Sequence, residues 1–314
     1  MRKFKVLVTC PPMLGMIDNF SEISNSLGIE LIPAKVKQTL TEDELIRSLP
    51  EFDGWIIGDD PASEKVFESG ANGLLKAAVK WGIGIDNVNF NSCKKLNISI
   101  TNTPAMFGKE VADVSICYLH ALARNIVEID REVRKGNWIK PSGISVAGKT
   151  AAIIGFGDIG RNTAKRLLSS DMNIIVYDPF INEETIDDKV KLYQWPLGIE
   201  LADFIIINCS LTSSSYHMIN NETIKLMKKG VRIINVGRGP IIEESALIHN
   251  LNNEYIHSVA LDVYENEPIS LNSPLLNNTR CILGSHNASN TKEAVIRTSK
   301  KAIKIISDFL NQRV

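Results

Sequence analysis

The segment GFGDIG, residues 155–160, constrains the fold of this chain more than any other. It fits the spacing G-x-G-x-x-G, which on its own often arises by chance. Here it follows the apolar run TAAII and precedes the helix-like run RNTAKRLLSS, and a second apolar run, NIIVY, ends at Asp178. A strand, a glycine turn, a helix and a second strand that ends in an acidic residue together predict a dinucleotide-binding βαβ unit.

Each part of this unit has a physical task. Gly155 permits a tight turn, Gly157 lets the backbone approach a pyrophosphate, and Gly160 lets the helix pack close to the strand. The helix N-terminus offers N–H groups and a positive dipole end to the anion. Asp178 would accept hydrogen bonds from the adenosine ribose and repel a 2′-phosphate, which favours NAD over NADP. The alternative is a glycine-rich turn in an unrelated α/β domain, with Asp178 as a cap, but the complete βαβ context favours the nucleotide.

Strand-like and helix-like segments alternate on both sides of this unit. Apolar, β-branched runs such as FKVLVT, GWIIG and ISITN alternate with amphipathic stretches in the first hundred residues, and the pattern repeats after residue 148. This alternation predicts parallel sheets covered by helices on both faces. A chain of 314 residues has the length of two domains. We therefore expect two doubly wound, Rossmann-like α/β domains with a cleft between them.

The order of the segments predicts where these domains begin and end. A long helical stretch, about residues 108–136, joins the two patterns, and the last segment is again helical. A final helix that follows a complete second domain would return to the first domain. We expect residues 1–101 and 291–314 to form the substrate domain, and residues 102–290 to form the NAD-binding domain.

The composition argues against several classes of partner and location. The net charge of −1 gives no reason to expect a nucleic-acid or anionic-membrane partner. No apolar run approaches the roughly 18 residues of a membrane span. The start, MRKFKVLVTC, lacks the apolar length and cleavage site of a signal peptide and predicts a first strand. Five scattered cysteines without a CxxC pair favour a reducing compartment, so we expect a cytoplasmic protein without a metal site.

Polar groups follow the later strands of the second pattern. Arg238 lies between two glycines after IINV, Asp262 and Glu267 lie in ALDVYENEP, and His286 follows the short apolar run CIL. The carboxyl ends of parallel strands meet at one edge of a sheet, so these groups should converge there. Arginine binds carboxylates through its fork, histidine exchanges protons near neutral pH, and a carboxylate behind it orients it. Each residue alone has an ordinary alternative: Arg238 could be a surface charge, Glu267 a solvated loop acid and His286 a cap.

The chain resembles the D-isomer-specific 2-hydroxyacid dehydrogenases along nearly its whole length. The matching motifs are KWGIGIDNV, GKTAAIIGFGDIGR, YDP, MKKGVRIINVGRGPIIEESAL, ALDVYENEP and SHNASNTKEA, and their combination is highly specific. The resemblance is greatest to the phosphoglycerate dehydrogenase-like branch. It implies Arg238, Glu267 and His286 as catalytic residues, NAD as cofactor, and a homodimer.

The resemblance also implies the residues that bind the cofactor and the substrate. Cofactor contacts would come from the three glycines of the turn and from Asp158, Ile159, Asp178, Ser210, Thr212, Val236, Gly237 and Asp262. The substrate carboxylate would bind to the backbone of Trp81, Gly82, Ile83 and Gly84, with Lys80 nearby.

Four positions depart from the pattern of the family. Ser285 replaces the proline that often precedes the catalytic histidine, and Asn287 and Ala288 replace a small apolar pair. These changes put the shape of the pocket wall in doubt but leave the role of His286. Asp113 stands where glutamate is common, which is a minor change.

The expected reaction is reversible oxidation of a 2-hydroxy acid, in which His286 takes the hydroxyl proton and Arg238 holds the carboxylate. Three alternatives remain open. One is 3-phosphoglycerate dehydrogenase proper, one is an enzyme of the same fold that acts on formate or phosphite, and one is an NAD-sensing scaffold similar to transcriptional corepressors.

The segment after GWIIG bears on the substrate, because it reads DDPAS. If Asp59 and Asp60 face the cleft, they would each repel a phosphate by about 1 kcal/mol. Lys80 is the one obvious cation near them in the sequence pattern. We therefore expect a small, unphosphorylated 2-hydroxy acid, unless both aspartates turn to solvent as loop caps.

Overall fold

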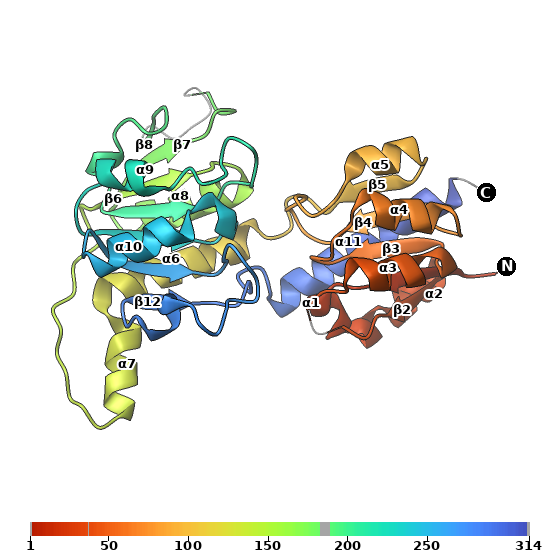
Figure 1. Ribbon diagram of the computed structural model, residues 1–314, viewed down its shortest axis with the longest axis horizontal. Coiled ribbons are helices and arrows are strands. Elements are labelled where there is room, and N and C mark those ends of the chain that lie inside the picture. The colour runs from red at the N-terminus through yellow and green to blue at the C-terminus, as the bar shows by residue number, and fades with distance from the viewer. Residues whose placement is uncertain (1, 37, 183–188, 313–314) are drawn as a thin grey trace. The chain divides into compact units, whose positions relative to one another are not determined.

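The computed structural model describes residues 2–36, 38–182 and 189–312, and the chain divides into two compact units (Figure 1). Unit 1 comprises residues 1–106 and 290–314, and unit 2 comprises residues 107–289. Residue 1 and residues 313–314, at the outer limits of the expected substrate domain, lie outside the described residues.

Unit 1 is a parallel five-stranded sheet of order β2-β1-β3-β4-β5. Its strands are β1 (Phe4–Val8), β2 (Ile29–Pro33), β3 (Gly54–Ile57), β4 (Ala77–Lys80) and β5 (Ser99–Asn102). Its helices are α1 (Pro11–Leu14), α2 (Ser21–Ser26), α3 (Glu42–Ser48), α4 (Glu64–Ala71), α5 (Phe90–Lys95) and α11 (Lys292–Asn311). Every strand pairing is parallel, because each connection between strands carries a helix across the sheet.

The last helix, α11, packs against β3 and β4 of this sheet and appears in blue among the red and orange N-terminal elements (Figure 1). Among its contacts, Trp81 Nε1 donates to Ser299 Oγ at 3.1 Å, and the Ile306 side chain lies against Gly54 of β3. The opposite face of the sheet carries a separate apolar core around Trp55 and Phe67. Residues from both ends of the chain thus form one sheet unit.

Unit 2 is a parallel seven-stranded sheet of order β12-β11-β10-β9-β6-β7-β8. Its strands are β6 (Thr150–Ile154), β7 (Asn173–Tyr177), β8 (Val190–Leu192), β9 (Phe204–Ile207), β10 (Val231–Asn235), β11 (Ile256–Leu261) and β12 (Cys281–Leu283). Its helices are α6 (Gly108–Arg124), α7 (Ile126–Arg134), α8 (Asp158–Leu168), α9 (Asn221–Leu226) and α10 (Glu244–Asn252). The chain reverses its direction across the sheet between β6 and β9, as in dinucleotide-binding folds.

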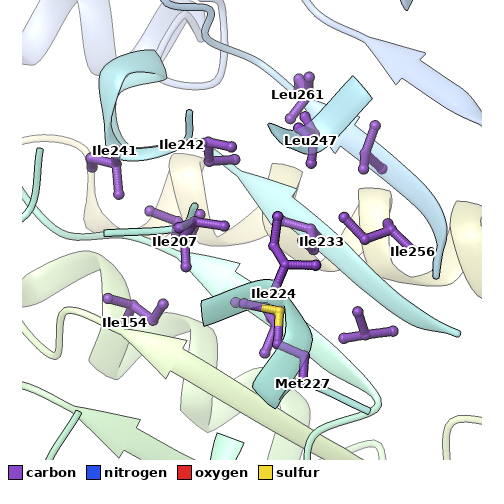
Figure 2. Close-up of a cluster of buried hydrophobic side chains, with 14 of the residues drawn as sticks. Ile154, Ile207, Ile224, Met227, Ile233, Ile241, Ile242, Leu247, Ile256 and Leu261 are labelled. Atoms are coloured by element: carbon purple, nitrogen blue, oxygen red, sulfur yellow. The ribbon is translucent and has the colours of Figure 1, made fainter. Parts of the chain in front are cut away.

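A cluster of isoleucines and leucines forms the core on one face of this sheet (Figure 2). Alternate residues of β9 and β10, among them Ile207 and Ile233, meet Ile224 of α9 and Leu247 of α10. The central strands are rich in isoleucine, valine and alanine because both of their faces are buried. The expected fold class, two doubly wound parallel-sheet units, is confirmed.

The helical stretch expected at about residues 108–136 consists of two helices rather than one. The chain forms α6 and α7, separated by Asn125, whose φ of 54° and ψ of 32° lie in the left-handed region. Asparagine adopts this conformation more readily than most residues, and it ends a helix there. The apolar spacing continues across the break, so periodicity alone could not reveal it.

Candidate active site

The predicted groups of unit 2 all follow the carboxyl ends of its strands. Strands β6 and β7 lead into the glycine turn and Asp178, β9 and β10 lead into the segments 208–215 and 236–240, and β11 and β12 lead into Asp262 and His286. Because the sheet is parallel, these segments share one edge.

The glycine turn begins in a conformation that side chains rarely adopt. Gly155 has a φ of +90°, and a Cβ there would lie 2.6 Å from backbone atoms of Cys209. A Cβ on Gly160 would lie 2.1 Å from the carbonyl oxygen of Gly155, so α8 packs as closely as a glycine allows. A Cβ on Gly157 would meet no described atom within 4 Å.

Gly157 is also the N-cap of α8, and no side chain of the described chain caps this helix. The first N–H groups of a helix have no partner within the helix, so they favour an anion. Of the three glycines of this turn, only Gly157 has open space beside it, and this space lies next to the N–H groups and fits the pyrophosphate of a dinucleotide. Asp158 of the turn lies against Gly108 of α6 and accepts from Asn162 Nδ2 at 3.1 Å, while Ile159 follows it in the first turn of α8.

Asp178 lies beside the glycine turn and forms a hydrogen bond with its backbone. Its Oδ2 accepts from the N–H of Phe156 at 2.7 Å, and its Oδ1 accepts from the N–H of Phe180 at 2.9 Å. The carboxylate therefore lies between the ends of β6 and β7, where a ribose next to the pyrophosphate would reach it.

The other predicted cofactor residues lie in tight turns. Ser215 Oγ accepts from the N–H of Thr212 and donates to the carbonyl of Ser210, each at 2.8 Å, which closes the turn after β9. After β10, Val236 N–H donates to Ile207 O at 3.2 Å, and Gly237 N–H donates to the side chain of Asn235 at 3.0 Å.

Arg238 follows in an extended conformation, and its Nη1 donates to the carbonyl of Gly237 at 2.8 Å. The carbonyl of Arg238 accepts from Asn235 Nδ2 at 2.9 Å. A Cβ on Gly239 would lie 1.8 Å from the carbonyl carbon and oxygen of Tyr264. The arginine turn therefore lies directly on the loop that carries Glu267.

Glu267 and His286 form a hydrogen-bonded pair. Nδ1 of His286 lies 2.7 Å from Oε2 of Glu267, and Oε1 of Glu267 accepts from the N–H of Tyr264 at 3.1 Å. About three quarters of each paired side chain is buried. The structure thus brings Arg238, Glu267 and His286 to adjacent segments at one edge of the sheet, and it directs the second ring nitrogen, Nε2, away from the carboxylate.

Asp262 anchors the histidine segment. The buried carboxylate of Asp262 accepts hydrogen bonds from the N–H groups of Asn287 at 3.1 Å and Ala288 at 2.8 Å. The backbone carbonyl of Asp262 accepts a hydrogen bond from the N–H of His286 at 2.7 Å. These bonds support His286 in a left-handed conformation with a φ of 55°. The cofactor contact expected of Asp262 stays a prediction, and its anchoring role was not predicted from the sequence.

A second histidine–carboxylate pair, between His217 and Glu265, was also missed. Its only signal in the sequence is that Glu265 lies in the same motif as Glu267 and that His217 is one of five histidines. Nothing local connects the two positions.

In unit 1, the segment expected to hold the substrate carboxylate follows β4. Gly82 has a φ of +134°, and its N–H donates to Thr103 Oγ1 at 2.8 Å. The carbonyl of Ile83 accepts from Asn102 Nδ2 at 3.1 Å, with Gly84 next in the chain. The neighbouring strand β5 therefore holds this segment in place.

The charged groups near this segment differ from the expectation. Asp60 faces neither a cleft nor solvent, because it is fully buried and accepts hydrogen bonds from Thr9 Oγ1, Leu40 N–H and Gly58 N–H. Burial raises the pKa of its carboxyl group. Lys80 is 2% exposed and donates to the carbonyl of Gly58 and to Asp59 Oδ1 at 2.9 Å. The local pattern DDPAS could not predict this burial, because the partners of Asp60 and Lys80 come from other strands and loops.

A pocket of about 750 Å³ lies beside these residues within unit 1. Its polar lining includes Asp59, Ser63, Asp86, Asn87, Asn89 and Asn91. The pocket carries two carboxylates in its wall.

Residues 2–36, 38–182 and 189–312 contain no group of three or more histidine, cysteine, aspartate or glutamate side chains that could hold a metal ion. None of their helices is long and apolar enough to cross a membrane.

Residues 116–288 match the family model of the D-isomer-specific 2-hydroxyacid dehydrogenase NAD-binding domain. The chain belongs to this family. Unit 2 is therefore the family's NAD-binding domain, and the open glycine turn with Asp178 beside it fits NAD as the cofactor.

Three relatives of the dehydrogenase family illustrate the range of similarity. A D-3-phosphoglycerate dehydrogenase of Archaeoglobus fulgidus is 32% identical over 92% of this chain, which spans 54% of that protein. A glyoxylate reductase of Thermofilum pendens is 33% identical over 83% of this chain and 79% of its own length. The structure of apo D-lactate dehydrogenase from Escherichia coli matches with a TM-score of 0.85 and 27% identity, over 98% of this chain and 97% of that one. The chain thus spans about half the length of the first relative.

Proposed function

We propose that this member of the dehydrogenase family is an NAD-dependent D-2-hydroxyacid dehydrogenase, with Arg238, Glu267 and His286 as its catalytic residues. The observation that carries the proposal is the contact of 2.7 Å between His286 Nδ1 and Glu267 Oε2, on a loop that also supports the Arg238 turn. A histidine held in this way through Nδ1 exchanges its proton through Nε2.

The roles of the three residues follow from their chemistry. His286 Nε2 accepts the hydroxyl proton during oxidation and returns it during reduction. Glu267 keeps the ring oriented and stabilises its protonated form, because a carboxylate next to an imidazolium lowers the free energy of the charged state. Arg238 binds the substrate carboxylate through its fork and polarises the C2 oxygen. Bound NAD supplies the two-electron acceptor or donor.

The cofactor would be held by the turn around Gly157, with Asp158 and Ile159 in the first turn of α8, and by Asp178. Further contacts would come from Ser210, Thr212, Val236, Gly237 and Asp262. In unit 1, the backbone of residues 81–84 would hold the substrate carboxylate.

We further propose that the substrate is a small, unphosphorylated 2-hydroxy acid. Lys80 does not support a phosphate site, because its ammonium group is buried and already contacts Asp59. The nearby pocket adds Asp86 to Asp59, and two carboxylates would repel a phosphate. Hydroxyl or amine groups of a substrate suit such a wall better.

A panel of 2-oxo acids, followed by the loss of NADH absorbance, tests both proposals. Turnover of glyoxylate or hydroxypyruvate would support the dehydrogenase, and inactivity with every 2-oxo acid would refute it. A higher kcat/KM for phosphohydroxypyruvate than for hydroxypyruvate would refute the unphosphorylated substrate and indicate 3-phosphoglycerate dehydrogenase. Formate and phosphite, assayed with NAD, and capture of protein partners without turnover test the remaining alternatives.

The proposed assembly is a homodimer, and α7 supports it. None of the residues of α7 is buried, and Ile126, Val133 and Trp138 on and after this helix are exposed. Asp130 pairs with Arg134 on the same helix, which limits the repulsion between two copies. Sedimentation velocity of the protein and of Trp138→Ala tests this: a monomeric wild-type protein would refute it.

The proposed location is the cytoplasm. Its support is that all five cysteines, which the structure describes, are unpaired, as a reducing compartment favours. Recovery of the protein from a secreted fraction of its native cells would refute this location.

A further inference from the structure

The pair formed by His217 and Glu265 lies next to the proposed catalytic pair. Nε2 of His217 hydrogen-bonds to Oε1 of Glu265, which precedes Glu267 by two residues. Both side chains are mostly buried, at 30% and 26% exposed. The ring of His217 also stacks on Tyr216, with 4.0 Å between ring centroids and 19° between planes. Stacking and burial therefore restrict the orientation of the His217 ring that contacts Glu265.

The backbone of His217 connects to the arginine turn. Its N–H donates to the carbonyl of Pro240 at 2.9 Å, two residues after Arg238. Its carbonyl accepts from Asn220 Nδ2 at 3.1 Å, and Asn220 is the N-cap of α9. These bonds support a left-handed conformation with a φ of 50°. His217 thus joins α9 to the segment that carries Arg238.

The loop that carries Glu267 has other restraints of its own. The carboxylate of Glu244, at the start of α10, accepts a hydrogen bond from the N–H of Glu265. Burial, together with the charge of Glu265, raises the pKa of Glu244. Tyr264 OH donates to the carbonyl of Gly284 at 2.7 Å, which links the loop to the histidine segment. Only the contact with His217 links the side chain of Glu265 to the segment after β9 among the hydrogen bonds of the described residues.

We propose that His217 is a positioning residue, which aligns Arg238 and Glu267 through its backbone bond to Pro240 and its side-chain bond to Glu265. This inference rests on the proposed function. Its physical basis is that misplacing a catalytic group by about 1 Å can lower the rate about 10²-fold. A single residue that bonds to both segments limits their relative movement.

The left-handed backbone of His217 guides the choice of variants. His217→Asn suits this backbone conformation, yet its side chain is too short to reach Glu265. His217→Gln keeps an N–H donor at a reach similar to that of Nε2. Glu265→Ala removes the acceptor from the other side. His249→Asn is the matched control, because His249 lies exposed on α10 and pairs only locally, with Asn253.

In steady-state kinetics with the best 2-oxo acid, we expect His217→Asn and Glu265→Ala each to lower kcat about tenfold to a hundredfold. The KM and the Kd of NADH should change less than kcat. His217→Gln should recover more of kcat than His217→Asn. The kcat of the double variant His217→Asn/Glu265→Ala should be no lower than that of the less active single variant, since both substitutions break the same contact.

Three results would overturn the inference: a wild-type kcat in His217→Asn, additive losses in the double variant, or an equal loss in His249→Asn. A measurement without turnover keeps this test separate from the proposed function. In proton NMR of the apo protein, the ring signals of His286 should move in His217→Asn and Glu265→Ala but not in His249→Asn. Unmoved signals would refute the coupling, whereas moved signals in a protein that reduces no 2-oxo acid would refute only the proposed function.

Discussion

Two alanine substitutions in the glycine turn separate cofactor binding from folding. Gly157 and Gly160 lie in the same turn, and neither has a positive φ. A methyl group on Gly157 meets no protein atom within 4 Å, whereas a methyl group on Gly160 lies 2.1 Å from the carbonyl oxygen of Gly155. The first substitution therefore fills only the space proposed for the pyrophosphate, and the second forces α8 away from β6.

The magnitudes follow from these distances. For Gly157→Ala we expect the free energy of unfolding to stay within about 1 kcal/mol of the wild type, since alanine also reduces the entropy of the unfolded chain. NADH binding should weaken about 100-fold, or roughly 2.7 kcal/mol, because the methyl group would fill the space proposed for the pyrophosphate. Gly160→Ala should lower the free energy of unfolding by about 3 kcal/mol, because the neighbour of its Cβ is backbone and cannot rotate away.

Urea denaturation followed by circular dichroism measures the stability of both variants, and NADH fluorescence titration measures the binding. Each variant is the control for the other. If Gly157→Ala bound NADH as tightly as the wild type, the pyrophosphate would not lie at this turn. If Gly157→Ala unfolded as readily as Gly160→Ala, the open space beside Gly157 would be wrong.

Four further substitutions test the site and the sheet. Asp178→Ala should reduce a preference for NADH over NADPH that is at least about tenfold in kcat/KM, or roughly 1.4 kcal/mol; equal efficiency of the wild-type protein with both cofactors would contradict this role. His286→Ala should lower kcat by roughly 10²–10⁴ with little change in the Kd of NADH, and an unaltered kcat would exclude it as the acid–base group. Glu267→Gln should shift the pH profile of kcat/KM more than it lowers the maximum, and an unchanged profile would argue against its contact with His286. Burial opposes the ionisation of Asp203, but the hydrogen bond from Lys228 at 2.6 Å contributes to a lowered pKa. Ionised Asp203 therefore stabilises the fold above the ordinary pKa of an aspartate, and this stabilisation is lost as the pH falls through the lowered pKa. Asp203→Asn should lower the free energy of unfolding by about 1 kcal/mol at pH 7 and by less at pH 3.

The local pattern of the chain was enough to predict the architecture and the segments in which we propose the chemistry takes place. Alternating β-branched and amphipathic runs specify parallel sheets, because strands buried on both faces must be apolar throughout. The glycine spacing at residues 155–160 predicts a close turn by stereochemistry alone, and the close approaches of Gly155 and Gly160 agree with that reading. Arg238, Glu267 and His286 were found because each follows a strand and because parallel strands end at one edge.

Contacts between distant segments were decided only by the tertiary structure. Asp60 accepts a hydrogen bond from Thr9, and His217 hydrogen-bonds to Glu265, 48 residues away in the sequence. Asp262 anchors the N–H groups of Asn287 and Ala288, a role that neither its place after a strand nor the family resemblance indicated. Periodicity describes which face of an element is apolar, but it carries no information on which loops meet after the strands have been ordered in the sheet. The sequence pattern therefore determined the two sheets and the proposed catalytic residues, while the packing of the loops at the sheet edges determined which partners hold those residues in place.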